Sequence, residues 1–432
     1  MSGHPSLTVS APPGAEALGP SVAKSSPWSR KGAVEVPRAA VLIVARNEEP
    51  VIAATLGSVL ASYEAHDVFL FDDASTDATA TIARGYLPAW NVIEHATNVG
   101  KSRGLETALT QHIYPAGYEY VTIVDADTTL EPDYREHVIR TLEEDLAVVC
   151  AAGQVKSRPY GTNVISIYRA CLYFLWQGLF KRLQSAVNAI AIAPGCASTW
   201  RTSALRRIEF DHRMSTEDFN LSIAAHRLGL GRIKYVHEAV VWTQDPLTLR
   251  AFVRQVQRWS RAWWEAVRFH KLGLLWVRRN AEGRWRLSGL DVVNAALVVT
   301  LEVFFIRLLA LSVFILTPLE AWPGVLFPDT TAGLVLDLVV QAAVVMGAVM
   351  VAAAATGRLL MVPLAPVIAA LMVVEYVIST LALASVIRRL YRIPRSDRGL
   401  VSAAAAWESP ERRQVRASVP QYSRESRSGV TE

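Results

Sequence analysis

Short apolar runs alternate with helix-like stretches early in the sequence, and this alternation restricts the possible folds more than any other feature. The apolar runs read AAVLIVA, DVFLFDD, NVIEH and YVTIVDAD. Helix-like stretches begin near Glu48, Asp77 and Ser102, between consecutive runs. Strands that alternate with helices in this way favour a mostly parallel, doubly wound α/β sheet.

Polar clusters follow three of the predicted strands. They are Arg46-Asn47, Asp72-Asp73 and Asp125-Ala126-Asp127. In open α/β sheets ligands bind beyond the carboxyl ends of the strands. The three clusters therefore predict a ligand site along one edge of the sheet.

The sequence changes character after the run AVVCAAG. An aromatic and less regular stretch, IYRACLYFLWQGLF, comes first, and Thr216-Glu217-Asp218 then starts a predicted helix. From Pro246 onward, Trp and Phe mix with many Arg, a pattern typical of an amphipathic helix at a membrane interface. An ordinary core-facing helix with a solvated basic side is the alternative. We place a catalytic domain at residues 38–245 and the amphipathic region at 246–287.

Three long hydrophobic segments near residues 290–316, 332–354 and 359–387 make up a predicted membrane region, 288–390. Each exceeds the ~20 residues that a helix needs to cross a bilayer. A hydrophobic content of 51 % and a mean hydropathy of +0.23 agree with a membrane part. The expected location is the cell (plasma) membrane, as a multi-pass protein with a cytoplasmic catalytic domain.

The charges around these segments conflict over topology. Arginines precede the first segment and follow the third, and both groups are expected on the cytoplasmic side of the membrane. Three crossings would instead place the two groups on opposite sides. Two prolines, Pro363 and Pro366, offer one resolution: the third segment is re-entrant or interfacial. Charged residues inside the segments either pair with one another or line a polar path. These residues are Glu302, Arg307, Asp337 and Glu375.

The two ends of the chain and its cysteines exclude several classes of protein. Residues 1–37 lack the apolar run of a signal peptide and are predicted to be disordered, as is the polar tail, 391–432. The 3 cysteines have no CxxC spacing, which excludes a disulfide framework or a thiolate metal site and favours a reducing cytosol. No basic helix with interleaved aromatics points to nucleic acid. The net charge of +5 better suits an anionic lipid surface.

The carboxylates of Asp125 and Asp127 are the predicted metal site. A pair at one strand end suits Mg²⁺ or Mn²⁺, held together with phosphate oxygens, and such an ion stabilises a diphosphate leaving group. A loop acid that caps the helix near Pro132 is the alternative for an isolated pair. Asp73 is placed to bind a base or ribose, and Asp77 to cap a helix. Lys101 stands at a helix start, where it can approach phosphate or remain a solvated charge.

Two later motifs complete the predicted site. Glu217 and Asp218 supply carboxylates far along the sequence, and Asp218 is the candidate general base. A helix cap with Thr216 as capping residue is the alternative. On the amphipathic helix, Arg258 can bind a diphosphate through its planar fork, one turn from Gln255, and Trp259 offers an aromatic face for a sugar ring.

These motifs, taken in order, resemble those of the family 2 inverting glycosyltransferases of GT-A fold. The motifs are Asp73, Asp125-Ala126-Asp127, Thr216-Glu217-Asp218 and Gln255-x-x-Arg258-Trp259. The resemblance covers about Val41 to Trp264. It is strongest to the membrane synthase branch, which includes hyaluronan, chitin, cellulose and poly-N-acetylglucosamine synthases.

The resemblance implies a role for each motif. Asp73 contacts the nucleotide base, the Asp125/Asp127 pair engages metal and diphosphate, and Asp218 is the base. The Gln255 to Trp259 segment cradles diphosphate and acceptor. Gly195 and Cys196 match the region that lines the acceptor pocket, with Cys196 a pocket wall rather than a nucleophile, since inversion needs no covalent intermediate.

The expected reaction is transfer of a hexose or N-acetylhexosamine from a nucleotide diphosphate sugar, with UDP favoured by the resemblance, to a growing glycan. Single transfer to a lipid acceptor is the alternative, because few membrane helices are visible for a polymer channel. A non-catalytic membrane subunit with a degenerate domain is the third hypothesis, although no site acid is lost. Membrane lipids, a homo-oligomer and an export partner are the further expected partners.

Overall fold

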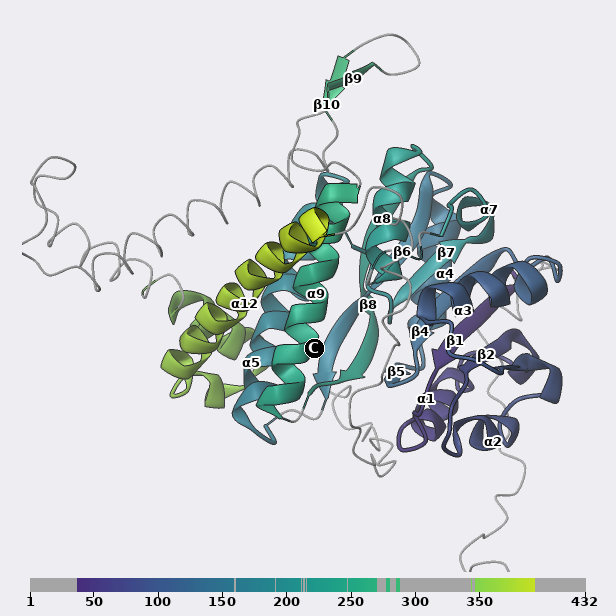
Figure 1. The fold of residues 1–432 in the computed structure, drawn as a ribbon, viewed down its shortest axis with the longest axis horizontal. Coiled ribbons are helices and arrows are strands. Elements are labelled where there is room, and N and C mark those ends of the chain that lie inside the picture. Colours follow the sequence, from purple (N-terminus) through teal and green to yellow (C-terminus); the bar gives the residue numbers. More distant parts are fainter. Residues whose placement is uncertain are drawn as a thin grey trace, which may run out of the picture. The chain divides into compact units, whose positions relative to one another are not determined.

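The computed structural model describes residues 37–158, 161–190, 192–210, 212, 214, 216–246, 248–269, 277–279, 285–287, 343 and 346–392. Its first part confirms the predicted alternation of strands and helices (Figure 1). The strands are β1 (Ala39–Ala45), β2 (Val68–Asp73), β3 (Val92–His95) and β4 (Tyr120–Asp125). The helices between them are α1 (Ile52–Val59), α2 (Thr79–Arg84) and α3 (Lys101–Ala108), the last continued by the π-helical turn η4 (Leu109–Ile113). Two short 3-10 turns, η2 (Ala65–Asp67) and η3 (Ala89–Asn91), lead into β2 and β3.

An eight-stranded sheet in the order β3-β2-β1-β4-β7-β6-β8-β5 forms the centre of the described chain. Its later strands are β5 (Thr128–Leu130), β6 (Val148–Arg158), β7 (Ser198–Arg201) and β8 (Arg232–Gln244). Strands β3, β2, β1 and β4 run parallel, as do β6 and β8, whereas β7 is antiparallel to β4 and β6, and β5 is antiparallel to β8. The mostly parallel α/β sheet predicted from the sequence is confirmed. Its antiparallel strands are β7, between β4 and β6, and β5, at the edge next to β8.

Strand β8 contains a bulge where it pairs with β6. Gly153 pairs with Val236 and the next residue, Gln154, pairs with Val240. The three residues of β8 between these pairs therefore have no pairing partner on β6. Beyond the bulge the ladder is regular as far as Arg158 and Gln244.

Apolar clusters cover both faces of the sheet. One contains Val41, Ile43 and Leu70 and packs against α1, and the other contains Leu42, Val44 and Phe71 and packs against α3. Every residue of β1 is buried, as expected for a strand between two parallel neighbours with both faces covered. These clusters hold the carboxyl ends of β1, β2 and β4 side by side.

The aromatic stretch after β6 is helical, which corrects its description as less regular. It forms α5 (Val164–Leu172), the π-helical run η5 (Tyr173–Phe180) and α6 (Lys181–Ala186). Asn163 begins α5 with a capping box to Ser166. A 3.6-residue period is hard to recognise in this run because apolar side chains occupy all sides of it.

Further described helices are α4 (Tyr134–Glu144), α7 (Thr202–Leu205), α8 (Glu217–Arg227), α9 (Leu249–Phe269), η7 (Leu359–Met361) and α12 (Ala365–Arg392). Residues 346–356 are helical as well. A separate two-stranded pair joins β9 (Val277–Arg279) to β10 (Trp285–Leu287). Helix α9 confirms the predicted helix after Pro246. Its buried Phe252 and Val256 pack in one cluster with residues of α5 and α12, which favours the core-facing alternative for these two side chains. Contact of α9 with membrane lipids stays a prediction.

The predicted membrane segments are only partly described. Segment 290–316 and the first part of 332–354 lie outside the described residues. Among the residues that are described, no helix is both long and apolar enough to cross a membrane. In the third segment the prolines do not interrupt a helix: Pro363 lies in a turn and Pro366 in the first turn of α12, where a missing N–H leaves no bond unmade.

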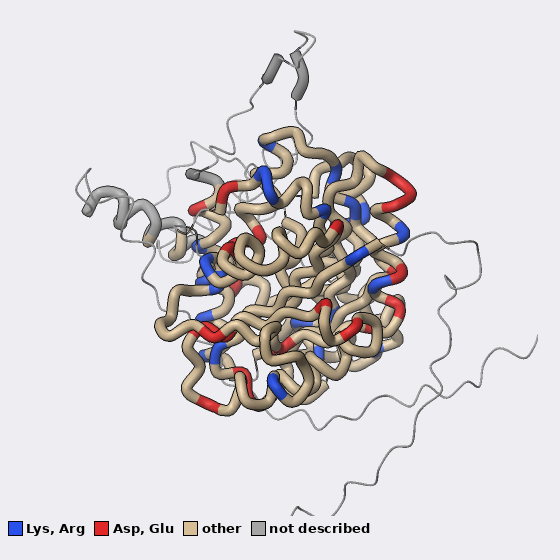
Figure 2. Tube along the Cα trace, turned by 90° about the vertical axis from the view of Figure 1, so that its right-hand side faces the viewer, with Lys and Arg blue, Asp and Glu red and all other residues tan. Residues whose placement is uncertain are grey.

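Charged residues of both signs are interspersed along the described chain (Figure 2). Several form partly exposed ion pairs, among them Arg84 with Glu94, Arg140 with Glu136, and Arg232 with Asp145. Exposed pairs of this kind are worth only about 0–1 kcal/mol each. The packed apolar clusters therefore dominate the stability of the fold.

Candidate active site at the carboxyl edge of the sheet

Two loops at the carboxyl ends of β1 and β2 bind each other through reciprocal hydrogen bonds. The Asn47 amide donates to Ser75 Oγ at 3.0 Å, and Asn47 Oδ1 accepts from the Thr76 amide at 2.8 Å. Arg46 Nη1 donates to the Asp73 carbonyl at 2.7 Å. Two non-glycine residues here have positive φ, Asn47 at 53° and Ala74 at 57°. Such backbone persists only where surrounding contacts hold it, as it does at many ligand sites.

Asp73 is fully buried at the end of β2. Its Oδ1 accepts from the Val99 amide at 2.7 Å and its Oδ2 from the Gly100 amide at 2.9 Å. Gly100 has a φ of 85°, which glycine adopts without strain. Asp73 therefore fixes the loop that starts α3, and its contact with a nucleotide base stays a prediction. The neighbouring Asp77 accepts from the Thr79 amide through its Oδ1 at 3.0 Å, but the cap position of α2 is Ala78, so the prediction that Asp77 is the capping residue is not confirmed.

Lys101, the first residue of α3, joins two of the predicted motifs. Its Nζ pairs with Asp125 Oδ1 and lies 2.5 Å from Glu217 Oε1. Burial alone would lower the pKa of Lys101, but the two carboxylates outweigh burial and raise it. Lys101 is thus a positively charged bridge between residues that lie 92 positions apart, at 125 and 217.

Gly195 lies against this bridge. A Cβ atom at this position would be 2.9 Å from Glu217 Oε1 and 3.3 Å from Lys101 Nζ. A side chain at this position would therefore displace the ends of the Glu217 and Lys101 side chains. The segment predicted to line the acceptor pocket is therefore in contact with the motif that contains the candidate base.

Asp218 is partly buried at the start of α8. Burial and the neighbouring Glu217 carboxylate raise the pKa of Asp218 to about 6, whereas Lys101 lowers it. A carboxylate with this pKa is deprotonated at neutral pH and more basic than an ordinary aspartate, as a general base requires. Thr216 occupies the cap position of α8, but its side chain makes no capping hydrogen bond, so the capping alternative is not supported.

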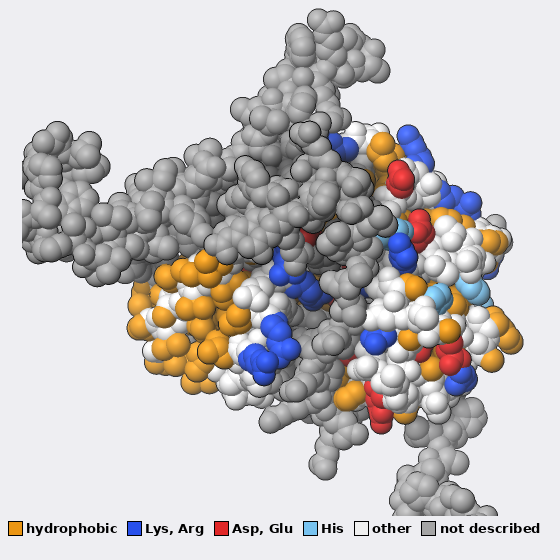
Figure 3. All heavy atoms as spheres, viewed as in Figure 1, with side chains coloured by type: hydrophobic (Ala, Val, Ile, Leu, Met, Phe, Trp, Pro, Cys, Tyr) orange, Lys and Arg blue, Asp and Glu red, His pale blue; other side chains and the backbone are white. Residues whose placement is uncertain are grey.

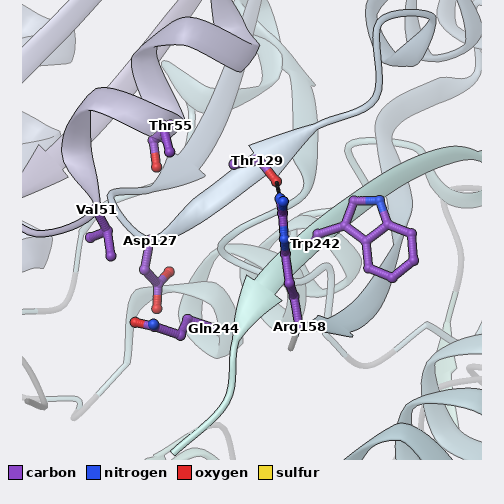
Figure 4. Close-up of a pocket in the computed structure, with 8 residues that line it drawn as sticks. Val51, Thr55, Asp127, Thr129, Arg158, Trp242 and Gln244 are labelled. Carbon is purple, nitrogen blue, oxygen red and sulfur yellow. Dashed lines mark hydrogen bonds between the residues drawn. The ribbon is translucent and has the colours of Figure 1, made fainter. Parts of the chain in front are cut away.

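Asp127 lines a pocket between α1, β5 and the ends of β6 and β8. The pocket has about 320 Å³ of empty space, part of it open to solvent. Asp127 and Gln244 point toward one another, and Arg158 lies between them and Trp242 (Figure 4). The residues that line the pocket are Val51, Ala54, Thr55, Asp127, Thr129, Arg158, Trp242 and Gln244. The helix-capping alternative for the Asp125/Asp127 pair fails, since the cap position of α4 is Asp133.

Arg158, Trp242 and Gln244 were not among the predicted site residues. Arg158 and Gln244 are the last residues of β6 and β8, two parallel strands. The rule that ligands bind beyond carboxyl strand ends would have pointed to them. The sequence interpretation applied that rule only to the first strands of the sheet.

The side chains of Asp125 and Asp127 are of the type that binds a divalent metal, and their binding of one stays a prediction. Both supply hard carboxylate oxygens, and the Asp125 side chain is 36 % exposed, so a ligand can reach it. In the described part of the chain no group of three or more His, Cys, Asp or Glu is arranged to hold a metal ion. The remaining donors would come from the substrate and water, as is usual for Mg²⁺ bound with phosphates.

Cys196 is buried next to these acids. Burial raises the pKa of the Cys196 thiol well above its usual range. The thiol is therefore neutral and a poor nucleophile. This agrees with the expectation that Cys196 is not a nucleophile, and its place in the wall of an acceptor pocket stays a prediction.

The last predicted motif lies on α9. Gln255 and Trp259 are partly buried and Arg258 is exposed. Phe219, next to Asp218, packs edge-on against Trp263 of α9 with ring centroids 5.9 Å apart. Helix α9 is thus attached to the helix that carries the candidate base, while binding of a diphosphate by Arg258 stays a prediction.

Comparisons with known proteins agree with this geometry. The family model described as "Glycosyltransferase like family 2" matches residues 37–262, just over half of the chain. Poly-beta-1,6-N-acetyl-D-glucosamine synthase of Staphylococcus aureus is 30 % identical over 222 residues, covering 51 % of this chain and 53 % of that protein. The same enzyme of Staphylococcus epidermidis is 28 % identical over 243 residues, covering 54 % and 58 %. The chain therefore spans about half the length of these relatives.

A solved structure was also matched. It is a mannosyltransferase from Pyrobaculum calidifontis in complex with GDP-Man and Mn²⁺, with a TM-score of 0.49 and 18 % identity. The match covers 83 % of this chain and 88 % of that one.

Proposed function

The chain belongs to glycosyltransferase family 2, and from this premise we propose that it transfers a hexose or N-acetylhexosamine from a nucleotide diphosphate sugar to a growing glycan, with inversion. The observation that carries the proposal is the Lys101 bridge. It places the acid pair at the end of β4 next to the Glu217-Asp218 motif at the start of α8. Binding of a diphosphate and activation of an acceptor then take place at one edge of the sheet.

Asp218 acts as the general base in this proposal. It takes the proton from an acceptor hydroxyl while that oxygen bonds to the anomeric carbon from the face opposite the leaving group. The bond to the nucleoside diphosphate breaks and the diphosphate takes its electron pair. One such step inverts the anomeric centre, so no protein nucleophile is required, in agreement with the neutral thiol of Cys196.

The other site residues bind and orient the substrates. Asp125 and Asp127 would hold Mg²⁺ or Mn²⁺, which when bound neutralises charge on the diphosphate. Lys101 supplies a further positive charge beside Asp125. Asp73 fixes the loop under the nucleotide, and Arg258 and Trp259 are placed on α9 for the diphosphate and the sugar.

The donor is proposed to be a UDP-linked N-acetylhexosamine. Support comes from the two staphylococcal relatives, whose names specify synthesis of poly-β-1,6-N-acetyl-D-glucosamine. The family model matches residues 37–262, which include the proposed site residues.

We further propose that the protein acts at the cytoplasmic face of the cell membrane, as a homo-oligomer or with an export partner. Apolar side chains gather over α12 and the neighbouring helical residues and are bordered by basic ones (Figure 3). The exposed members include Met350, Val351, Leu359, Leu360 and Leu381. An apolar surface of this kind marks a site of association with lipid or protein, and the hydrophobic segments at 290–316 and 332–354 support lipid.

The proposal is tested on membranes that contain the full-length protein. They are incubated with single UDP-sugars and Mg²⁺ or Mn²⁺, and products are sized by mass spectrometry beside Asp218→Asn membranes. A ladder of sugars that is absent from the variant is expected. One sugar on a lipid would favour the single-transfer alternative, and no product from any donor would contradict the enzymatic function.

A further inference from the structure

A buried arginine lies behind the motif on α9 and has no role in the chemistry above. The side chain of Arg169, on α5, is only 2 % exposed. Its Nε lies 3.6 Å from Asp245 Oδ1, and the Asp245 side chain is 0 % exposed. We call Arg169, Asp245, Tyr173, Trp259 and Ser157 the arginine cluster.

Arg169 touches two aromatic rings of the cluster. Its guanidinium carbon lies 4.4 Å from the ring centroid of Trp259 and 4.8 Å from that of Tyr173, and its Nη2 donates to the Tyr173 hydroxyl at 2.9 Å. Stacking of a guanidinium on an indole is among the stronger cation–π contacts, more so when it is shielded from water. One face of the Trp259 ring is therefore covered and its orientation restricted.

Asp245 connects the cluster to the sheet. The hydroxyl of Ser157, on β6, donates to its Oδ2, and the Asp245 amide donates to the Arg158 carbonyl at 3.1 Å. The preceding residue, Gln244, lines the Asp127 pocket. Consecutive residues at a strand end face opposite sides, so β8 points one side chain at the candidate active site and the next at the arginine that holds Trp259.

Burial of such a pair is unfavourable unless the two charges satisfy each other. Burial raises the pKa of Asp245 to about 6, and Arg169 lowers it. The pair joins elements that are far apart in sequence, α5 at 169 and the residue that follows β8, 245. Because a buried charge pair adds little net stability, its role here is better explained by geometry.

We propose that Arg169 and Asp245 are positioning residues that hold Trp259 in the orientation needed to bind the acceptor sugar. The inference rests on the proposed glycosyl transfer. Arg169 acts through Trp259 and touches no substrate. Its loss affects use of the acceptor more than use of the donor.

Kinetics test the acceptor role. Initial rates of the full-length protein are measured against acceptor oligosaccharide and against UDP-sugar for wild type, Arg169→Gln and Arg169→Lys. In Arg169→Gln we expect the acceptor KM to rise about tenfold, as loss of a shielded cation–π contact implies, with a donor KM changed less than about twofold. Arg169→Lys keeps the positive charge, so its acceptor KM should lie between those of wild type and Arg169→Gln.

Two further variants separate positioning from folding. Arg169→Gln combined with Asp245→Asn leaves no unpaired buried charge and is expected to reproduce the acceptor effect with better folding. Arg201→Gln is the matched control. Arg201 also stacks on a tyrosine, Tyr120. Tyr120 is the first residue of β4 and Asp125 of the candidate site is the last, so replacing Arg201 should leave both KM values unchanged.

A measurement without turnover tests the orientation of Trp259 itself. The protein is labelled with 5-fluorotryptophan, and the ¹⁹F resonance of Trp259 is identified by its absence from Trp259→Phe. Arg169→Gln should shift or broaden this resonance, and Arg201→Gln should not.

The outcomes distinguish the two proposals. An unchanged resonance, or equal changes in both KM values, overturns the positioning role. If wild type transfers no sugar, the proposed function fails, while the resonance still decides whether Arg169 orients Trp259. A shifted resonance together with a selective rise in acceptor KM supports both.

Discussion

The two halves of the sheet edge hold their polar residues in different ways. At the ends of β1 and β2, polar side chains are held by hydrogen bonds to backbone amides of neighbouring loops, as Asp73 is by Val99 and Gly100. At the ends of β6 and β8, side chains from distant elements hold one another, as Arg169 does Asp245 and Trp259. We call these the loop-bonded half and the side-chain-bonded half. The first half is therefore held by the backbone of adjoining loops, whereas the second depends on packing between elements far apart in sequence.

The largest expected effect is on the base that lies between the two halves. Asp218→Asn should lower sugar transfer by about 10³-fold, because loss of a general base typically costs 10² to 10⁴. The rate is measured with the membrane assay. Asp145→Asn is a matched control, since Asp145 lies before β6, at the opposite end of that strand from Arg158, and pairs with Arg232. Equal activity in Asp218→Asn and wild type would remove the base.

Replacing the acid pair should cost less than replacing the base. Asp125→Asn and Asp127→Asn are each expected to lower transfer about 10²-fold and to raise the Mg²⁺ or Mn²⁺ concentration needed for half-maximal rate, because a carboxylate binds a hard cation better than an amide does. A metal titration of initial rates measures this. An unchanged metal requirement in both variants would place the ion elsewhere.

The pH dependence should reflect Asp218. Its pKa is raised to about 6 and the base form is the deprotonated one. The value of kcat/KM should therefore fall about tenfold for each pH unit below about 6 and level off above it. A rate–pH profile with saturating metal checks this. A profile that is flat from pH 5 to 8 would contradict the assignment.

The loop-bonded half should lose stability when its carboxylate is replaced. In Asp73→Asn the amide nitrogen faces a backbone N–H, so one of two charge-assisted hydrogen bonds is lost, at a cost of about 2 kcal/mol. Thermal or chemical unfolding measures this. Arg84→Ala, which removes a partly exposed pair with Glu94, should cost under about 1 kcal/mol, and an equal loss in both would contradict the comparison.

The smallest expected effect is a gain in stability from Asp218→Asn. The folded-state pKa of Asp218 is raised, so the folded protein binds more protons than the unfolded chain between about pH 4 and 6. Stability from this group is complete below pH 4 and is lost as the pH rises through about 6. The variant should therefore be about 1 kcal/mol more stable than wild type at pH 8, and equal to it at pH 4. Unfolding at the two pH values checks the sign.

Prediction from the sequence succeeded where the contacts are local. The strands and helices from β1 to β4, the helix at Glu217 and the helix after Pro246 follow from periodicity and strand-end polarity. The sequence predicted that Asp125, Glu217 and Gly195 belong to one site. It did not predict that Lys101 joins them, because spacing along the chain does not specify which cation lies between two distant carboxylates.

The rest depended on long-range packing. Nothing near Arg169 in the sequence distinguishes it from other arginines in aromatic surroundings, and its partner lies 76 residues later, at Asp245. The place of β7 between β4 and β6 also has no local signal, because a four-residue strand can pair with many others. The helical nature of residues 164–186 was missed for a related reason: apolar residues on every side remove the period that identifies a helix.

The bulge in β8 has a consequence for how this protein can change its length. Three residues, His237 to Ala239, separate the two regular parts of the ladder with β6. Because these residues have no pairing partner on β6, the bulge already absorbs an odd number of extra residues while Gln244 keeps its place on the ladder. Adding or removing one residue in the bulge should therefore leave the direction of Gln244 unchanged. The same change in the paired stretch from 240 to 244 would turn Gln244 to the other side of the sheet, so changes in length should be tolerated in the bulge and not in the stretch that follows it.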